Sequence, residues 1–129
     1  MDDLYQENIL DHFQNPRNKG ELAEPRTCVY ETNASCGDEI TIFIKTKKKD
    51  QQNQITNIKW QGSGCVISQA SVSLLTEKIL AEKLNLKQLL ELGETDMLEL
   101  LGLEKISTGR KKCLLLSLQA IKKSAQELK

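Results

Sequence analysis

The sequence lacks the features that would place a protein on a nucleic acid or in a membrane. Its 18 basic and 18 acidic residues cancel, so overall charge favours neither a nucleic acid nor an anionic membrane surface. No run of about 18 apolar residues is present, which argues against a transmembrane helix. The start, Met1-Asp2-Asp3, lacks the basic and apolar regions of a signal peptide. We therefore expect a cytoplasmic protein that binds neither nucleic acid nor membrane.

The four cysteines include no Cys-x-x-Cys pair, so any site that they share must be assembled by folding. In a reducing compartment cysteines serve more often in metal binding or catalysis than in disulfides. Three have distinctive surroundings, namely Ala34-Ser35-Cys36-Gly37-Asp38, Gly62-Ser63-Gly64-Cys65 and Arg110-Lys111-Lys112-Cys113. Three thiolates together with the carboxylate of Asp38 would complete a tetrahedral metal site. The alternative is that these are ordinary buried cysteines, although neighbouring glycines would let the backbone approach a ligand closely.

Hydrophobic periodicity divides the chain into a β-rich first half and a helical second half, and its length fits one domain over residues 1–129. The pattern predicts a helix over 3–14 and strands over Thr27–Asn33, Glu39–Lys45 and Gln54–Trp60. The polar run 47–53 is interpreted as a hairpin loop. Helical spacing begins at Cys65, with a break near Asn85, and Thr95 is predicted to cap a helix over 96–101. The last helix is the clearest, with apolar residues spaced four and three apart.

This layout places the three cysteines at the ends of elements rather than within them. Cys36 falls in the turn between the first two strands, Cys65 begins a helix, and Cys113 is predicted in the first turn of the last helix. A helix N-terminus stabilises a thiolate, so Cys113 is expected to have the best stabilised thiolate. Cys28 alternates with Tyr30 and is interpreted as a core residue. His12, the single histidine, is interpreted as a hydrogen-bonding structural residue rather than a metal ligand.

The chain resembles the iron–sulfur cluster assembly scaffolds, the family called IscU, SufU or the NifU N-terminal domain. The segments that carry the resemblance are Tyr5, Ile9-Leu10-Asp11-His12-Phe13, Asn15-Pro16-Arg17-Asn18-Lys19-Gly20, Cys36-Gly37-Asp38, Gly62-Ser63-Gly64-Cys65-Val66-Ile67-Ser68-Gln69-Ala70-Ser71 and Lys112-Cys113. The resemblance implies an α+β fold, in which helices pack on a small antiparallel three-stranded sheet. It also implies that Cys36, Asp38, Cys65 and Cys113 surround one site for zinc or a [2Fe–2S] cluster. The implied partners are a cysteine desulfurase and acceptor apo-proteins.

Three departures from the family pattern affect what the resemblance implies. The IscU branch has histidine before the third cysteine, where this chain has Lys112. That branch also carries a Leu-Pro-Pro-Val-Lys segment for a dedicated chaperone, and residues 102–109 contain nothing similar, which argues against chaperone hand-off. The motifs are nearer to the SufU branch, but segment 66–112 is too short for the insertion that SufU proteins usually carry. Lys112 is either a solvated surface residue or a charge that engages the site.

Three hypotheses about function remain open. The protein is a scaffold that assembles a [2Fe–2S] cluster and transfers it, a zinc-dependent sulfur acceptor of a desulfurase, or a binding module with structural zinc. The third is the weakest, because structural zinc sites usually contain paired Cys-x-x-Cys ligands. The scaffold hypothesis makes the protein no enzyme in the usual sense, whereas sulfur acceptance would be half of a transfer reaction. Cys36 and Cys113 are the candidate persulfide acceptors.

Overall fold

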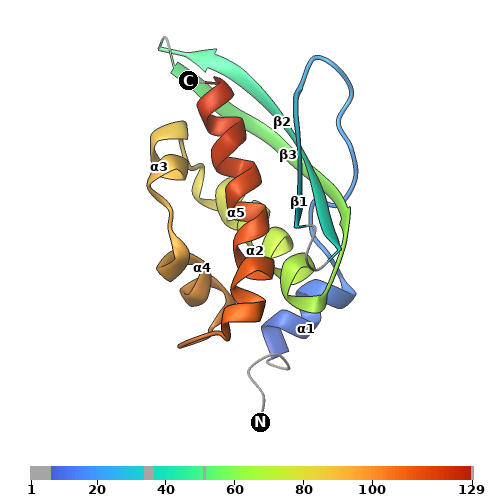
Figure 1. Ribbon diagram of the computed structural model, residues 1–129. Coiled ribbons are helices and arrows are strands. Elements are labelled where there is room, and N and C mark those ends of the chain that lie inside the picture. The colour runs from blue at the N-terminus through green and yellow to red at the C-terminus, as the bar shows by residue number, and fades with distance from the viewer. Residues whose placement is uncertain (1–6, 34–36, 51, 129) are drawn as a thin grey trace.

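The fold consists of a small sheet with helices packed on it, as seen in a computed structural model that describes residues 7–33, 37–50 and 52–128 (Figure 1). The elements in chain order are α1 (Glu7–Gln14), β1 (Thr27–Asn33), β2 (Asp38–Lys49), β3 (Gln52–Ser63), α2 (Val66–Glu82), α3 (Leu86–Glu91), α4 (Glu94–Leu101) and α5 (Thr108–Leu128). The predicted α+β class and its antiparallel three-stranded sheet are confirmed. No helix in these described ranges is long and apolar enough to span a bilayer.

The sheet has the order β1-β2-β3, and one of its faces forms the core. Side chains alternate between the two faces along a strand, and the register pairs Val29 with Ile42 and Ile42 with Trp60. All three of these side chains are buried. Figure 1 shows α5 and α2 lying against this face. Fully burying one aliphatic side chain such as Val29 or Ile42 contributes about 1.5–3 kcal/mol, so this layer contributes strongly to the stability of the fold.

One local prediction is confirmed in kind but not in extent, and another is wrong. The polar run 47–53 contains the predicted hairpin connection between β2 and β3, but this connection is shorter than predicted, because β2 continues to Lys49 and β3 begins at Gln52. Asp50 supplies the left-handed backbone that the tight connection needs, with φ 53°, and aspartate tolerates this conformation well. Thr95 does not cap α4, which already begins at Glu94 with Gly93 as its N-cap residue. There the Gly93 N–H donates to the Asp96 carboxylate at 2.8 Å.

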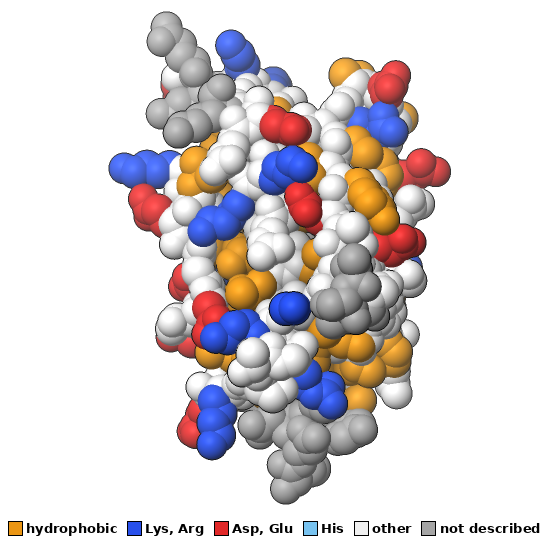
Figure 2. Space-filling view, in the orientation of Figure 1, with side chains coloured by type: hydrophobic (Ala, Val, Ile, Leu, Met, Phe, Trp, Pro, Cys, Tyr) orange, Lys and Arg blue, Asp and Glu red, His pale blue; other side chains and the backbone are white. Residues whose placement is uncertain are grey.

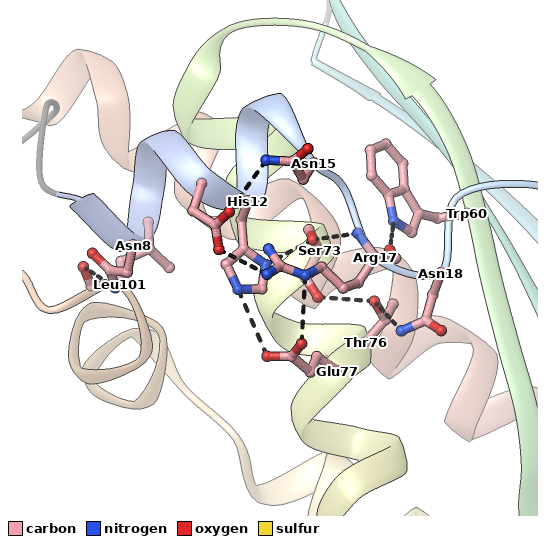
Figure 3. Close-up of polar contacts among 11 residues, drawn as sticks. Asn8, His12, Asn15, Arg17, Asn18, Trp60, Ser73, Thr76, Glu77 and Leu101 are labelled. Carbon is pink, nitrogen blue, oxygen red and sulfur yellow. Dashed lines mark hydrogen bonds and ion pairs between the residues drawn. The ribbon is translucent and has the colours of Figure 1, made fainter.

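A polar network with His12 and Ser73 at its buried centre fastens the N-terminal segment to the middle of α2 (Figure 3). His12 Nδ1 lies 2.8 Å from Ser73 Oγ, and the Arg17 N–H donates to the same oxygen at 2.8 Å. The carbonyl of Arg17 accepts from Trp60 Nε1 at 2.8 Å, which ties the segment to β3 as well. The predicted structural role of His12 is confirmed. We call His12, Arg17, Ser73 and Glu77 the anchor network.

Candidate metal centre

Asp38, Cys65 and Cys113 come together although they are far apart in the sequence. Asp38 is the first residue of β2, Cys65 is the N-cap residue of α2, and Cys113 lies in α5. One ligand atom from each residue lies within 4.8 Å of the ligand atoms of the other two. Two thiols and a carboxylate at this spacing could be bridged by a single cation.

The carboxylate of Asp38 is buried but only partly paired. The side chain is 2% exposed, and its Oδ1 accepts the Cys65 N–H at 3.2 Å. Its Oδ2 is buried and has no hydrogen-bond partner among the described residues. Because burying an unpaired carboxylate oxygen is costly, this atom could serve as a ligand for a cation.

Gly64 makes this close arrangement sterically possible. Its φ is +157°, and a Cβ at this position would lie 2.5 Å from both Asp38 Oδ1 and Ser68 Oγ. A side chain would therefore push Asp38 away from Cys65. The expectation that glycine beside the cysteines permits a close approach is confirmed here. Ser68 itself donates to the Cys65 carbonyl at 3.1 Å and supports the first turn of α2.

Cys113 departs from its predicted position. Helix α5 begins at Thr108, because the carbonyl of Ser107 accepts the N–H groups of Arg110 and Lys111 at 3.0 Å each. Cys113 therefore lies in the second turn, beyond the N–H groups that remain free at a helix start. Its side chain is buried.

The electrostatic expectation for Cys113 is also wrong. Burial is the main cause that raises the pKa of its thiol strongly, and the neighbouring Asp38 and Cys65 raise it further. In the metal-free protein Cys113 is thus held as a neutral thiol. A bound cation would favour the thiolate form instead, because metal ligation requires a deprotonated cysteine.

The remaining candidate residues lie in different environments. Cys36 falls outside the described residues; next to it in the chain, the Gly37 N–H donates to the Asn33 carbonyl at 2.9 Å. Arg110 and Lys112 are exposed on α5. Cys28 is exposed, so its predicted core role is wrong. In β1 the residues beside it, Thr27 and Val29, face the helices, and Cys28 points to the other side of the sheet.

The donor set fits a soft metal. Thiolates are preferred by zinc and by iron–sulfur clusters, whereas magnesium and calcium prefer oxygen ligands. One supporting residue was missed by the sequence analysis: Thr32 Oγ1 donates to the Asp38 carbonyl at 3.0 Å and steadies the start of β2. Because threonine is common in strands of every kind, the sequence offered no signal for this role.

Comparison with known proteins assigns the family. The model of the NifU-like N terminal domain matches residues 4–129, and the chain belongs to this family. The iron–sulfur cluster assembly scaffold protein IscU of Thermotoga maritima is 30% identical over 97% of this chain and 94% of the relative. The zinc-dependent sulfurtransferase SufU of Bacillus subtilis is 39% identical over a segment that covers 61% of this chain and 50% of the relative. The family resemblance inferred from the sequence is confirmed.

A solved structure supports the fold independently. The N-terminal part of a nitrogen-fixing NifU-like protein from Brucella abortus aligns with a TM-score of 0.76, covering 98% of this chain and 95% of that chain. Its sequence identity is 21%, so this likeness concerns the fold. The sheet and helices that carry Asp38, Cys65 and Cys113 thus form the fold of this family.

Proposed function

We propose that this protein assembles a [2Fe–2S] cluster on Cys36, Cys65 and Cys113, with Asp38 beside them, and transfers it to acceptor apo-proteins. The main support is the convergence of Asp38, Cys65 and Cys113 within 4.8 Å. The membership of the chain in a family with relatives named as cluster assembly scaffolds agrees with this proposal. A cysteine desulfurase is the expected source of sulfur.

The geometry suits cargo that is held for a time and then released. Thiolates bind iron firmly, whereas a carboxylate is a harder ligand that can be exchanged more readily. Cys65 is partly exposed, while Asp38 and Cys113 are buried. A partner would therefore approach the cluster from the side of Cys65.

A zinc-dependent sulfur acceptor is the second candidate. Two observations favour it: the similarity to the zinc-dependent sulfurtransferase SufU and Lys112 where the resemblance to IscU expects histidine. Zinc would be held by the same four residues and would keep the thiols deprotonated. In the transfer step, a thiolate of Cys36 or Cys113 attacks the terminal sulfur of the desulfurase persulfide. The bond between the two sulfurs breaks, and the desulfurase cysteine leaves as a thiolate.

The two candidates are separated by purification without oxygen and metal analysis, followed by incubation with a desulfurase and cysteine, either alone or together with ferrous iron and a thiol reductant that supplies the electrons to convert persulfide sulfur into sulfide. A scaffold should gain iron and acid-labile sulfide in equal amounts, together with visible absorption. A zinc-dependent acceptor should retain zinc, stay colourless and take up labelled sulfur from cysteine. Substitution Cys28→Ser is the matched control, because Cys28 is exposed on the outer face of the sheet. A protein that binds neither metal nor sulfur would contradict both candidates.

A further inference from the structure

A groove lies beside the candidate metal centre, between the end of β1 and the N-terminal half of α5. It encloses a cavity of about 370 Å³, to which β1 contributes Thr32 and Asn33 and α5 contributes Lys111, Lys112 and Gln119, among others. Lys112 directly precedes Cys113 in the chain, so one end of the groove adjoins the centre. In Figure 2 several Lys and Arg side chains lie over the first turns of α5 on this face.

The side of the groove formed by Thr32 and Asn33 belongs to β1, which is an edge strand of the sheet. β1 pairs with β2 on one side, and within the described ranges no strand pairs with its other side. Edge strands are usually protected against further pairing by lysine, proline or a bulge. The β1 sequence Thr-Cys-Val-Tyr-Glu-Thr-Asn contains neither lysine nor proline, and its pairing with β2 runs without a register shift. This edge could therefore accept another extended segment.

The side of the groove formed by α5 carries two lysines. Lys112 is exposed and forms no ion pair among the described residues, whereas the Lys111 ammonium lies 3.3 Å from the Glu94 carboxylate. Leu115, also on α5, adds a half-buried apolar surface to this side of the groove. A peptide in this groove would meet backbone groups on one side and apolar and cationic side chains on the other.

We propose that the groove docks an extended acidic segment of the acceptor apo-proteins, which pairs with β1 as a fourth strand and brings the acceptor next to Cys113. This inference rests on the proposed scaffold function. Main-chain hydrogen bonds between strands give affinity that does not depend on the side chains of the bound segment, so one groove can bind acceptors of unrelated sequence. The lysines then favour acidic segments over the many other extended chains in a cell.

The test is a titration of the full chain, metal-free and zinc-loaded, with an acetylated peptide as long as β1 that alternates glutamate and valine. Backbone amide signals should shift at residues 27–33 and 108–119 and remain unchanged elsewhere. A peptide of the same sequence with N-methylated amides cannot pair with the strand and should bind at least about tenfold more weakly. A lysine–valine peptide should also bind about tenfold more weakly or worse. Equal binding of all three peptides would overturn the proposal.

Two matched variants locate the binding site. Gln119→Glu adds negative charge inside the groove and should weaken binding of the acidic peptide about tenfold. Gln126→Glu makes the same change on an exposed part of α5 outside the groove and should leave binding unchanged. The rate of cluster transfer to an apo-ferredoxin, normalised to the cluster content of each variant, should fall for Gln119→Glu and not for Gln126→Glu. Equal effects of the two variants would contradict the proposal.

Binding of a different partner at the β1 edge would give a different result in these experiments. If β1 amide signals change with protein concentration in the absence of peptide, a second copy of the chain occupies the edge and the proposal is wrong. If the desulfurase, rather than the acceptor, displaces the peptide, the groove serves sulfur delivery and the proposal also fails. Failure of the chain to form a cluster would overturn the scaffold function alone, because the peptide titration needs no cluster.

Discussion

Two buried polar clusters meet helix α2, and they differ in how completely their polar atoms are paired. In the anchor network, Ser73 Oγ bonds both the His12 ring and the Arg17 N–H at 2.8 Å. In the candidate metal centre, Asp38 Oδ2 has no hydrogen-bond partner among the described residues, and burial holds Cys113 as a neutral thiol. A paired cluster holds elements together, whereas an unpaired one is poised for a ligand.

The charged groups of the two clusters differ in whether an opposite charge lies beside them. One guanidinium nitrogen of Arg17, Nη1, is buried without a hydrogen-bond partner. Its charge is nevertheless balanced, because the guanidinium lies 2.7 Å from Asp11 and 3.8 Å from Glu77. Asp38 has no such counter-charge in the part of the chain that the structure describes. A cation at the centre would supply the missing charge.

The largest expected effect is the loss of metal binding when a cysteine of the centre is replaced. Cys65→Ser and Cys113→Ser each remove a soft ligand, and we expect zinc affinity to fall at least about 100-fold, since even residues that only support metal ligands contribute 10–100-fold. Competition with a coloured chelator measures this affinity. Cys28→Ser should bind zinc like the unmodified protein. If Cys28→Ser weakened zinc binding as much as Cys65→Ser, the assignment of the zinc site to Asp38, Cys65 and Cys113 would be wrong.

The sequence alone predicted that Asp38, Cys65 and Cys113 lie together, but it did not predict the electrostatics of Cys113. Unusual residues in a fixed order identified Cys65, Cys113 and Asp38, because such motifs depend on residue type and not on exact helix ends. The sequence did not show where α5 begins, since Ser107 receives the first hydrogen bonds through its backbone carbonyl. Nor could alternation along β1 tell which face would be covered, so Cys28 was assigned to the wrong side. The first error concerns a helix boundary, which residue type does not fix exactly, and the second concerns tertiary context, which short-range patterns do not contain.

The next largest effect should be loss of stability when the anchor network is broken. Ser73→Ala leaves the buried His12 nitrogen and the Arg17 N–H without partners, which should cost about 2–3 kcal/mol of the free energy of unfolding. Thermal and denaturant unfolding measure this loss, and zinc affinity should remain nearly unchanged.

A neighbouring serine provides the control for this prediction. Ser71 is as completely buried on the same helix, but its hydroxyl has no hydrogen-bond partner among the described residues. Ser71→Ala should therefore be neutral or stabilising. Equal destabilisation by the two substitutions would mean that pairing does not distinguish these serines.

Asp38→Asn should have a smaller effect on the free energy of unfolding, and the sign of this effect should differ between the metal-free and the zinc-loaded protein. In the metal-free protein it removes a buried carboxylate that lacks a counter-charge, which should raise the free energy of unfolding by about 1 kcal/mol. With zinc present the variant should be the less stable protein, because it binds the metal more weakly and gains less stability from it. Unfolding of both proteins with zinc and with a chelator tests this reversal. Glu39→Gln, at an exposed neighbour, should change neither value, and a loss of stability for Asp38→Asn in both conditions would contradict the prediction.

The smallest expected effect is a pH dependence that arises in the anchor network. Burial is the main cause that lowers the pKa of His12 from its ordinary value of 6.5; Arg17 lowers it further, while Glu77 and Asp11 oppose these effects. The unfolded chain therefore binds a proton more readily than the folded protein as the pH falls below 6.5. The stability contributed by neutral His12 is fully present above that pH and is lost as the pH falls toward the lower, folded pKa.

This prediction can be tested cleanly because His12 is the single histidine of the chain. Its ring signals in NMR, followed from about pH 8 to about pH 5, should give a pKa below that of a histidine in an unfolded peptide. Melting temperatures over the same range should fall toward acid, and they should fall less for His12→Gln, whose amide oxygen can still accept a hydrogen bond from Ser73. Zinc must be absent from these measurements, since proton competition at the cysteines would add a second pH dependence. If the melting curves of the two proteins shifted in parallel with pH, the titrating group would lie outside the anchor network.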